Sequence, residues 1–327
     1  MIKLTTNLQK ETLESILKET HLETSYKNWV TNFSLNLSNI WAESSGRDLD
    51  PNSNPSLLKT NSAIVIGAGP SLNQHKHLEL LSDSNFTGSI ICTDRSLVPA
   101  LKAGVTPDKF KNFYVVTIDT DEIIKTFYED PIIKQFSNSI NGIFTTVTNP
   151  ITVKTARDQG IKIHWIHALF DYEEGEKSFN QISGLMTRAK NHTLGLPAIQ
   201  TGGNVGTSCW FVAWKILHCN NIGLIGINHS WDEKDEWAKI ASHCKISPDM
   251  EIDDELRKKL FPKVYNPEFD CNCILDPVFQ YYSNALKEFI VKASKYVKTI
   301  NATEGGTIFG DGIECTTLKK FIENYNF

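Results

Sequence analysis

Residues that could bind a phosphate group follow directly after a strand-like run. The run Ser62–Ile66 is apolar, small and β-branched, which predicts a buried strand. Gly67 and Gly69 come next, and Pro70 and Ser71 can open a helix. A strand that turns into a helix through glycines gathers backbone N–H groups and the positive end of the helix dipole at one point. We expect a phosphate-binding turn here, with an ordinary strand–helix connection as the alternative.

Three aspartates follow two further strand-like runs. Asp94 comes after Gly88–Thr93, and Asp119 and Asp121 come after Phe113–Ile118. Two carboxylates two residues apart can face one Mg²⁺ or Mn²⁺ that also holds a diphosphate, and Asp121 is also suited to cap a helix. Asp94 could accept a hydrogen bond from a ribose or a base, or cap its own helix. We treat Asp94 as a candidate nucleotide-binding residue and Asp119 and Asp121 as candidate metal ligands.

A second glycine-rich segment precedes an apolar helix. Thr201, Gly202, Gly203 and Asn204 stand shortly before the run Ser208–His218, which is apolar nearly all round and predicts a buried helix. Backbone N–H groups and hydroxyls in such a loop can bind a phosphate or a sugar. The sequence has no Gly-Lys-Ser/Thr of an ATPase P-loop, and the first turn lacks the third glycine of a dinucleotide fingerprint.

Asn228 and His229 follow the strand-like run Asn221–Ile227. At the end of a strand both side chains would face the same crevice as the loops above, and histidine is suited to proton transfer near neutral pH. We name them as candidate catalytic residues, with a structural histidine as the alternative. His243 lies in a charged, helix-like segment and is the weaker candidate acid or base.

The elements that must position these residues alternate regularly between strands and helices. Such alternation predicts a Rossmann-like α/β fold, with a parallel sheet and helices on both faces. Ligands of such sheets bind at the carboxyl ends of the strands, so the candidate residues should gather around one crevice. The predicted strands are Ser62–Ile66, Gly88–Thr93, Phe113–Ile118, Gly142–Val147, Ile161–Ile166 and Asn221–Ile227, and the predicted helices between them are Leu72–Leu81, Arg95–Ala103 and Asp121–Phe136.

Three regions of the chain differ in character. We divide it into an N-terminal helical extension and linker (1–56), a nucleotide-binding domain (57–235) and a C-terminal helical region that closes on the core (236–327). The apolar stripe of the extension should cover part of the following domain, and Ser45–Ser56 reads as a polar linker. The long segment His167–Pro197 is either a lid over the site or a solvated insertion. Helices are also expected within Trp231–Phe261, over Tyr281–Lys298 and over Thr317–Glu323.

Composition excludes several classes of function. The chain has 327 residues, 40% of them hydrophobic and 22% charged, with a net charge of −5 that is spread along the chain. These values are typical of a soluble globular protein and argue against a general nucleic-acid or anionic-membrane binder. We expect no secretion signal, no membrane span and a cytoplasmic location with the seven cysteines reduced. The spacing of His243-Cys244 and of Cys271 and Cys273 is not that of a usual zinc site.

In combination these segments resemble the MptE-like domain family. The resemblance covers roughly Ser62–Trp231, and it rests on motifs that are individually weak: Gly67-Ala-Gly69-Pro70-Ser71-Leu72, Asp94, Gly104-Val-Thr-Pro107-Asp108, Asp119, Thr201-Gly-Gly-Asn204-Val and Gly226-Ile-Asn228. The family includes archaeal 6-hydroxymethyl-7,8-dihydropterin diphosphokinases and the Maf motility-associated proteins, which are thought to transfer nonulosonic acids to flagellin. The opening turn also resembles that of bacterial sialyltransferases that use a CMP-sugar.

The resemblance implies two enzymatic activities. Asp119-Thr-Asp121 is similar to the Asp-x-Asp of the diphosphokinases, which would place Mg²⁺ and ATP there. The tail Thr303-Glu304-Gly305-Gly306 resembles the ending of Maf-type proteins and favours a glycosyltransferase with a nucleotide-activated sugar and a small-molecule, glycan or protein acceptor. Such a transferase needs no metal cofactor in the sialyltransferase-like form. Asn228 stands where the family usually has aspartate, which leaves a non-catalytic nucleotide-binding module as a third hypothesis.

Overall fold

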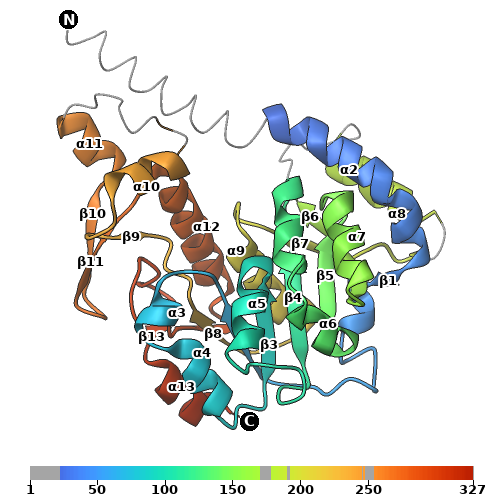
Figure 1. The fold of residues 1–327 in the computed structure, drawn as a ribbon, viewed down its shortest axis with the longest axis horizontal. Coiled ribbons are helices and arrows are strands. Elements are labelled where there is room, and N and C mark those ends of the chain that lie inside the picture. Colours follow the sequence, from blue (N-terminus) through green and yellow to red (C-terminus); the bar gives the residue numbers. More distant parts are fainter. Residues whose placement is uncertain (1–22, 170–177, 190–191, 245, 247–253, 327) are drawn as a thin grey trace, which may run out of the picture.

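A parallel β-sheet forms the centre of the molecule (Figure 1). The computed structural model describes residues 23–169, 178–189, 192–244, 246 and 254–326. Within these residues the sheet has ten strands in the order β1-β6-β5-β4-β3-β2-β8-β12-β13, with β7 paired to β6, and every pairing is parallel. The strands are β1 (Ser44–Ser45), β2 (Ser62–Ile66), β3 (Ser89–Thr93), β4 (Phe113–Thr117), β5 (Asn141–Thr145), β6 (Lys162–Leu169), β7 (Ala198–Gln200), β8 (Asn221–Ile225), β12 (Lys298–Asn301) and β13 (Ile313–Cys315).

Helices cover both faces of this sheet, which explains why its central strands are apolar throughout. Alternate side chains of β2 point to opposite faces: Ile64 and Ile66 join one hydrophobic cluster, whereas Ala63 and Val65 join the other. The first face is covered by α2 (Glu23–Ala42), α4 (His77–Asp83), α5 (Asp94–Lys102), α7 (Pro150–Asp158) and α13 (Leu318–Tyr325). The second is covered by α9 (Val205–Phe211), the π-helix η4 (Val212–Ile216) and α12 (Pro277–Ala293).

The strand order reverses at β2, because the chain first builds outward to β3, β4, β5 and β6 and then returns to add β8 and β12 on the other side. Such a reversal separates the loops that leave neighbouring strands and opens a crevice at their carboxyl ends. The fold class expected from the sequence is confirmed, and a cleft lies at the carboxyl ends of β2, β3 and β8.

The described residues between 231 and 275 form a small unit beside this cleft. It consists of a three-stranded antiparallel sheet in the order β10-β11-β9, with the helices α10 (Trp237–His243) and α11 (Asp254–Leu260). The strands are β9 (Trp231–Asp232), β10 (Lys263–Asn266) and β11 (Cys271–Ile274). Figure 1 shows this unit and α12 on the opposite side of the sheet's central strands from α2 and α8 (Phe179–Thr187).

Several details differ from the sequence-based expectations. The helix expected over Leu72–Leu81 is two short helices, α3 (Ser71–Gln74) and α4, because Lys76 takes a left-handed backbone with φ of 52°. The helix expected over Asp121–Phe136 is a 3₁₀ segment η2 (Glu122–Tyr128) followed by α6 (Ile132–Phe136), and η3 (Ser137–Ser139) leads into β5. Helix α7 was not predicted.

The C-terminal region and the linker also contribute strands. The segment 236–327 was expected to be helical, yet β12 and β13 extend the main sheet and β10 and β11 form a hairpin. The linker Ser45–Ser56 provides β1, and the 3₁₀ turn η1 (Gly46–Leu49) places Leu49 in the core. The long segment His167–Pro197 contains α8, while residues 170–177 and 190–191 lie outside the described residues. The domain bounds themselves remain a prediction.

Helix α2 covers the sheet as expected and is fixed by side-chain amides. Trp29, Phe33 and Ile40 are buried in the first hydrophobic cluster, whereas Tyr26 and Val30 of the same helix are exposed. The amide nitrogen of Asn32 donates to the carbonyl oxygens of Thr120 and Val147, both at 3.1 Å. No helix in the described part of the chain is long and apolar enough to cross a bilayer.

We predict that Asn32→Ala lowers the free energy of unfolding by about 1–3 kcal/mol, because the buried carbonyl of Val147 loses its side-chain donor and that of Thr120 keeps only Asn149 Nδ2. Ser38→Ala on the exposed face of the same helix is the control and should change it by less than about 0.5 kcal/mol. Urea denaturation followed by circular dichroism measures both. Equal values for the two variants would contradict the role given to Asn32.

Candidate functional site

A cleft of about 460 Å³ lies at the point where the strand order reverses. One side is made of main-sheet loops and the other of aromatic and charged side chains from the C-terminal unit. The lining residues from the sheet side are Gly67, Ala68, Gly69, Pro70, Thr93, Asp94, Arg95, Asn204, Val205, Gly206, Gly226, Ile227, Asn228, His229 and Ser230, and those from the C-terminal side are Trp231, Asp235, Lys239, His243, Phe279 and Tyr282.

Gly67 and Gly69 line the cleft, but their missing side chains serve a contact within the protein. A Cβ atom on Gly67 would lie 2.3 Å from the carbonyl oxygen of Gly226, and one on Gly69 would lie 2.1 Å from Asn228 Oδ1. The N–H of Gly67 donates to Ile225 O and that of Gly69 to Gly226 O, each at 2.8 Å. The glycines therefore let two loops touch, and these two N–H groups are not free for a phosphate as the sequence analysis expected.

A hydrogen bond between Ser71 and Asn228 stabilises this contact between the two loops. Ser71 is buried and its hydroxyl donates to Asn228 Oδ1 at 2.9 Å, while Pro70 lines the cleft beside it. The backbone carbonyl of Asn228 accepts from the N–H of Thr307 at 2.9 Å. An aspartate in place of Asn228 could accept the same hydroxyl, so this hydrogen bond does not explain the amide. Asn228 lies at the cleft as predicted.

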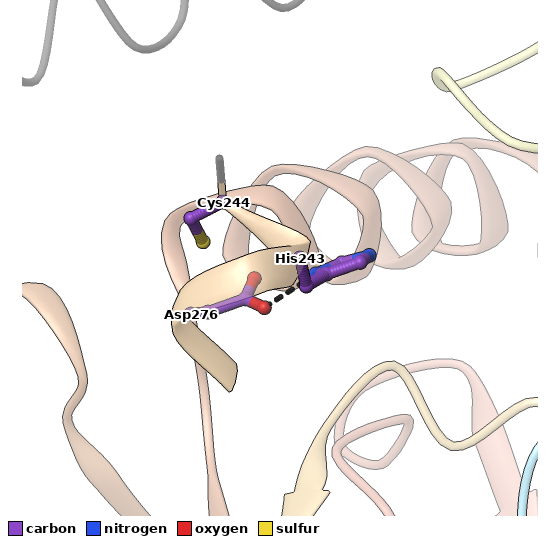
Figure 2. Close-up of side chains that lie close together, drawn as sticks. All are labelled: His243, Cys244 and Asp276. Atoms are coloured by element: carbon purple, nitrogen blue, oxygen red, sulfur yellow. Dashed lines mark hydrogen bonds and ion pairs between the residues drawn. The ribbon is translucent and has the colours of Figure 1, made fainter. Parts of the chain in front are cut away.

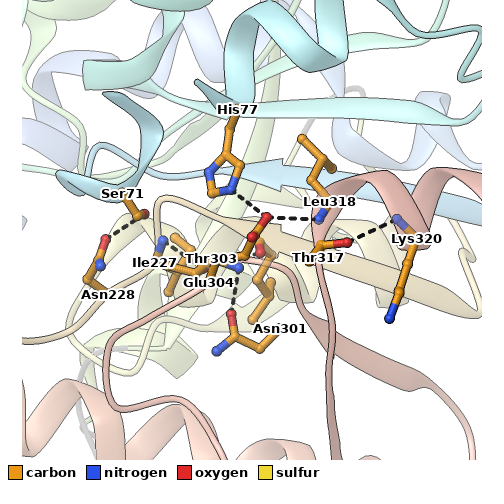
Figure 3. Close-up of polar contacts among 11 residues, drawn as sticks. Ser71, His77, Ile227, Asn228, Asn301, Thr303, Glu304, Thr317, Leu318 and Lys320 are labelled. Atoms are coloured by element: carbon orange, nitrogen blue, oxygen red, sulfur yellow. Dashed lines mark hydrogen bonds and ion pairs between the residues drawn. The ribbon is translucent and has the colours of Figure 1, made fainter. Parts of the chain in front are cut away.

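The segment Thr303–Thr307 contacts the loop after β8 that contains Asn228. Thr303 Oγ1 accepts from the N–H of Ile227 (Figure 3), and the N–H of Thr307 donates to the carbonyl of Asn228. Glu304 takes a left-handed backbone, and its Oε1 lies 3.2 Å from His77 Nε2 and accepts from the N–H of Leu318. Gly306 also has a positive φ, and a Cβ there would lie 2.3 Å from the carbonyl oxygen of Asn228. The tail motif singled out in the sequence thus holds the loop after β8 against α4 and α13.

Asp94 is the candidate residue whose environment most clearly calls for a ligand. It is 4% exposed, and one carboxyl oxygen accepts from the N–H of Arg95 at 2.7 Å while the other is buried without a partner. Burial raises the pKa of Asp94 to about 7; the Arg95 N–H and the Thr117 side chain oppose this shift and the charge of Asp119 adds to it. One of the two carboxyl oxygens of this cleft residue is thus buried without a hydrogen-bond partner.

Asp119 and Asp121 are placed differently from each other. Asp119 is partly buried, and burial raises its pKa, while Asp121 is exposed. Asp119 Oδ1 accepts from the backbone N–H of Asp121 at 3.1 Å, and neither residue belongs to the lining of the cleft. Asp121 precedes η2 but its side chain makes no capping bond. The charge of Asp119 nevertheless adds to the rise in the pKa of Asp94.

The loop Thr201–Asn204 is largely occupied by its own hydrogen bonds. Asn204 caps α9, with Oδ1 accepting from the N–H of Thr207 at 2.9 Å. Thr201 Oγ1 accepts from the N–H of Gly203 at 3.2 Å, and both Gly202 and Gly203 have a positive φ. Only Asn204 of these four residues lines the cleft, so the other three support the loop rather than face a ligand.

His229 faces the cleft in a strained and apolar setting. Its φ is 44°, its side chain lies beside Phe279 and Tyr282, and its Nδ1 atom is buried without a partner. Burial lowers the pKa of His229 to about 4, and the charge of Lys287 acts in the same direction. The imidazole is therefore neutral at pH 7 and could accept a proton but not supply one.

A second histidine, which the sequence analysis rated lower, has a carboxylate partner. His243 Nδ1 lies 2.6 Å from Asp276 Oδ2 (Figure 2). Asp276 also accepts from Trp231 Nε1 at 2.7 Å and from the N–H of Phe279 at 2.6 Å. The Sγ atom of Cys244 belongs to the same cluster, whose ligand-type atoms lie within 4.8 Å of one another. The sequence signal that could have pointed to Asp276 is its place directly before Pro277, because an aspartate before a proline marks a helix N-cap and hence a carboxylate in a fixed position.

Hydrogen bonds stabilise the cluster of His243, Cys244 and Asp276. The carboxylate of Asp276 is fully buried and already accepts three hydrogen bonds, and burial raises the pKa of the Cys244 thiol to about 12. A thiol that keeps its proton is a poor metal ligand. The geometry thus favours an orienting role of Asp276 toward His243 over a metal site.

The sequence matches one family model across most of this fold. The matched model is described as 6-hydroxymethylpterin diphosphokinase MptE-like and covers residues 31–234. The chain belongs to the MptE-like family. The matched region contains the sheet side of the cleft, whereas His243, Asp276, Phe279 and Tyr282 lie beyond it. No curated protein matches the sequence.

A solved structure shares the fold of this MptE-like protein. It is the MAf glycosyltransferase from Magnetospirillum magneticum AMB-1, with a TM-score of 0.54 and 12% sequence identity. The similarity covers 80% of the chain and 34% of the glycosyltransferase, so the chain spans about a third of that protein's length. The family model and the solved structure both carry the names of transferases, although the identity is low.

We predict that Gly67→Ala lowers the free energy of unfolding by about 3 kcal/mol, at the upper end of the range for overpacking, because the new methyl group meets backbone atoms that cannot rotate away. Gly184→Ala on α8 is the matched control, since nothing lies within 4 Å of its added Cβ. That control should be neutral or stabilise by up to about 1 kcal/mol. Thermal and urea unfolding measure both, and a tolerated Gly67→Ala would show that the two loops do not need their close contact.

The raised pKa of Asp94 predicts a particular pH dependence of stability. An acid that holds its proton more tightly in the folded state makes the free energy of unfolding fall as the pH rises from about 4 to about 7. The Asp94→Asn variant does not have this decrease. Its free energy of unfolding, relative to that of the unmutated protein, should therefore rise across that range by up to about 4 kcal/mol, and the difference should stay constant above it. Urea unfolding at pH 4.5, 6 and 8 tests this, with the exposed Asp83→Asn as control. Parallel curves for Asp94→Asn and the unmutated protein would contradict it.

Proposed function

We propose that this MptE-like protein is a glycosyltransferase that binds the nucleotide of an activated sugar in the cleft at the carboxyl ends of β2, β3 and β8. The observation that carries the proposal is the buried, unpartnered carboxyl oxygen of Asp94. A buried acceptor without a donor costs roughly 1–3 kcal/mol, which a hydroxyl of a bound ligand would recover. Ribose and sugar rings offer neighbouring hydroxyl groups that suit such an acceptor.

The turn after β2 and Arg95 would bind the phosphate end of the donor. Gly67, Gly69 and Pro70 form the wall of the cleft next to Asp94, and Ser71 holds that wall to Asn228. Arg95 lines the same wall with an exposed side chain. A guanidinium group binds a phosphate through two parallel hydrogen bonds and neutralises charge on the leaving nucleotide without a metal ion.

The opposite wall would bind the sugar. Trp231, Phe279 and Tyr282 line it and contact one another or His243 through their rings. Apolar ring faces with a few polar groups are typical of sites for small ligands. In this arrangement the anomeric carbon lies between the phosphate wall and the two histidines, where an acceptor hydroxyl can approach from the solvent side.

Diphosphate transfer from ATP to a pterin is the second candidate, and one observation favours it. The charge of Asp119 adds to the rise in the pKa of Asp94, and burial raises the pKa of both carboxyl groups. A pair of this kind could hold Mg²⁺ on a diphosphate, with Asp119 in the role that the sequence analysis gave to Asp119 and Asp121 together. A nucleotide-binding module without activity is the third outcome that the same experiment separates.

We predict that cytidine nucleotides raise the melting temperature without Mg²⁺. A ligand at 100 times its Kd stabilises the folded state by about 2.7 kcal/mol. The screen compares CMP, CDP and UDP with ATP and GTP, each with and without Mg²⁺, and adds a pterin to the ATP series. Stabilisation only by ATP with Mg²⁺ and pterin would contradict the proposal, and binding without turnover of any donor sugar or ATP would indicate the inactive module.

Asp94→Asn identifies the site in the same experiment. A hydroxyl that donates to the carboxylate favours its ionised form, so binding near pH 7 should release a proton, which calorimetry in buffers of different ionisation enthalpy detects. Asp94→Asn should weaken binding about tenfold and abolish the release, since a charge-assisted hydrogen bond contributes about 1.5–3 kcal/mol. Asp83→Asn should do neither.

A further inference from the structure

The cleft contains a histidine–carboxylate pair that the proposed function does not yet use. His243 ends α10, and Asp276 stands directly before α12, so two separate helices bring them together. The Nδ1–Oδ2 distance is 2.6 Å, and the Asp276 side chain is fully buried, while that of His243 is 31% exposed. The pair therefore has a buried end and an open end, and His243 lines the cleft.

The buried end is fixed from three directions. Trp231 Nε1 and His243 contact the same oxygen of Asp276, and the N–H of Phe279 contacts the other. The imidazole itself packs on the rings of Trp231 and Phe279, with centroid distances of 5.4 and 4.5 Å. Neither the carboxylate nor the ring can turn without breaking several of these contacts, so the orientation of His243 is determined in advance.

This orientation fixes the chemical state of the ring. A carboxylate next to Nδ1 requires a proton on that nitrogen, which leaves the lone pair of the neutral imidazole on Nε2. Figure 2 shows the second ring nitrogen pointing away from Asp276. A carboxylate behind a histidine also stabilises the imidazolium that forms when Nε2 takes up a proton. His229 in the same cleft has no carboxylate partner among the described residues, and its unpartnered Nδ1 atom is buried.

We infer that His243 is the general base of the transfer reaction and that Asp276 is its positioning residue; this inference rests on the proposed glycosyltransferase function. His243 Nε2 removes the proton from the acceptor hydroxyl as its oxygen bonds to the anomeric carbon of the sugar. The bond from that carbon to the phosphate oxygen breaks, and its electron pair leaves with the nucleotide. The imidazolium then returns its proton to water.

Several other charged and titratable groups lie near His243. Lys239 lies one turn earlier on α10, 2.8 Å from Asp235 and 5.1 Å from the centre of the Trp231 ring. Among the described residues, the groups to consider in a pH profile are Asp94, Arg95, His229, Asp235, Lys239, Cys244, Asp276 and Tyr282. Asp276 is the only one of these that forms an ion-pair contact with His243 in the described part of the chain.

The test measures transfer kinetics with the donor nucleotide-sugar that the binding screen identifies. His243→Ala should lower kcat by at least about 100-fold, the usual effect of losing a general base, while the KM for the donor changes by less than about threefold. Added imidazole should restore part of the rate. Asp276→Asn should lower kcat less and move the ascending limb of its pH profile, because a neutral amide cannot stabilise the imidazolium as the carboxylate does. His75→Ala, an exposed histidine outside the cleft, should behave as the unmutated protein.

The outcomes separate the inference from the proposed function. If the unmutated protein transfers sugar and His243→Ala keeps its kcat, or loses activity without any rescue while still folded and binding donor, the inference is wrong and the function stands. If the unmutated protein turns over no nucleotide-sugar, the proposed function fails and the inference fails with it. One zinc ion per chain in the purified protein, lost in His243→Ala, would also overturn the inference.

Discussion

The close contact between the turns after β2 and β8 is the constraint on which the rest of the site depends. Gly67 and Gly69 lie against Gly226 and Asn228 so tightly that no side chain fits between them. Two backbone hydrogen bonds of 2.8 Å continue the pairing of the strands past their ends. Both turns line the sheet side of the cleft, so their contact fixes the shape of that wall.

The support behind this contact extends to the end of the chain. Thr307 and Gly306 hold the carbonyl of Asn228, and Glu304 connects the same segment to α4 and α13. The strand β12 places that segment, since it pairs with β8 in the main sheet. The sheet therefore needs its C-terminal strands to complete the site, even though they follow the small unit that forms the opposite wall.

The sequence predicted the sheet side of the site well and the other side poorly, for physical reasons. Apolar β-branched runs such as Ser62–Ile66 have a period that identifies a buried strand, and parallel topology brings their carboxyl ends together. The same reasoning could not say whether a glycine makes room for a ligand or for another loop. For Gly67 it is the loop after β8, which lies more than 150 residues away in the chain.

The missed wall depends on contacts that have no local pattern. His243 and Asp276 are separated by a β-hairpin and a helix, and each is ordinary in its own segment: one ends a charged helix and the other caps the next. Strands β12 and β13 are only four and three residues long, too short to show an alternating pattern. Their places are set by pairing, of β12 with β8 and of β13 with β12. The resemblance to the MptE-like family, confirmed over residues 31–234, did not reach this wall.

The two buried carboxylates of the cleft differ in a way that suggests separate tasks. Asp276 accepts hydrogen bonds from Trp231, His243 and the backbone of Phe279, so both of its carboxyl oxygens have partners inside the protein. Asp94 is buried to a similar degree but leaves one oxygen without a donor. A satisfied carboxylate makes its surroundings rigid, whereas an unsatisfied one gains free energy when a ligand supplies the missing donor. The cleft thus has one rigid wall that orients a histidine. On the opposite wall, one carboxyl oxygen lacks a hydrogen-bond donor that a ligand could supply.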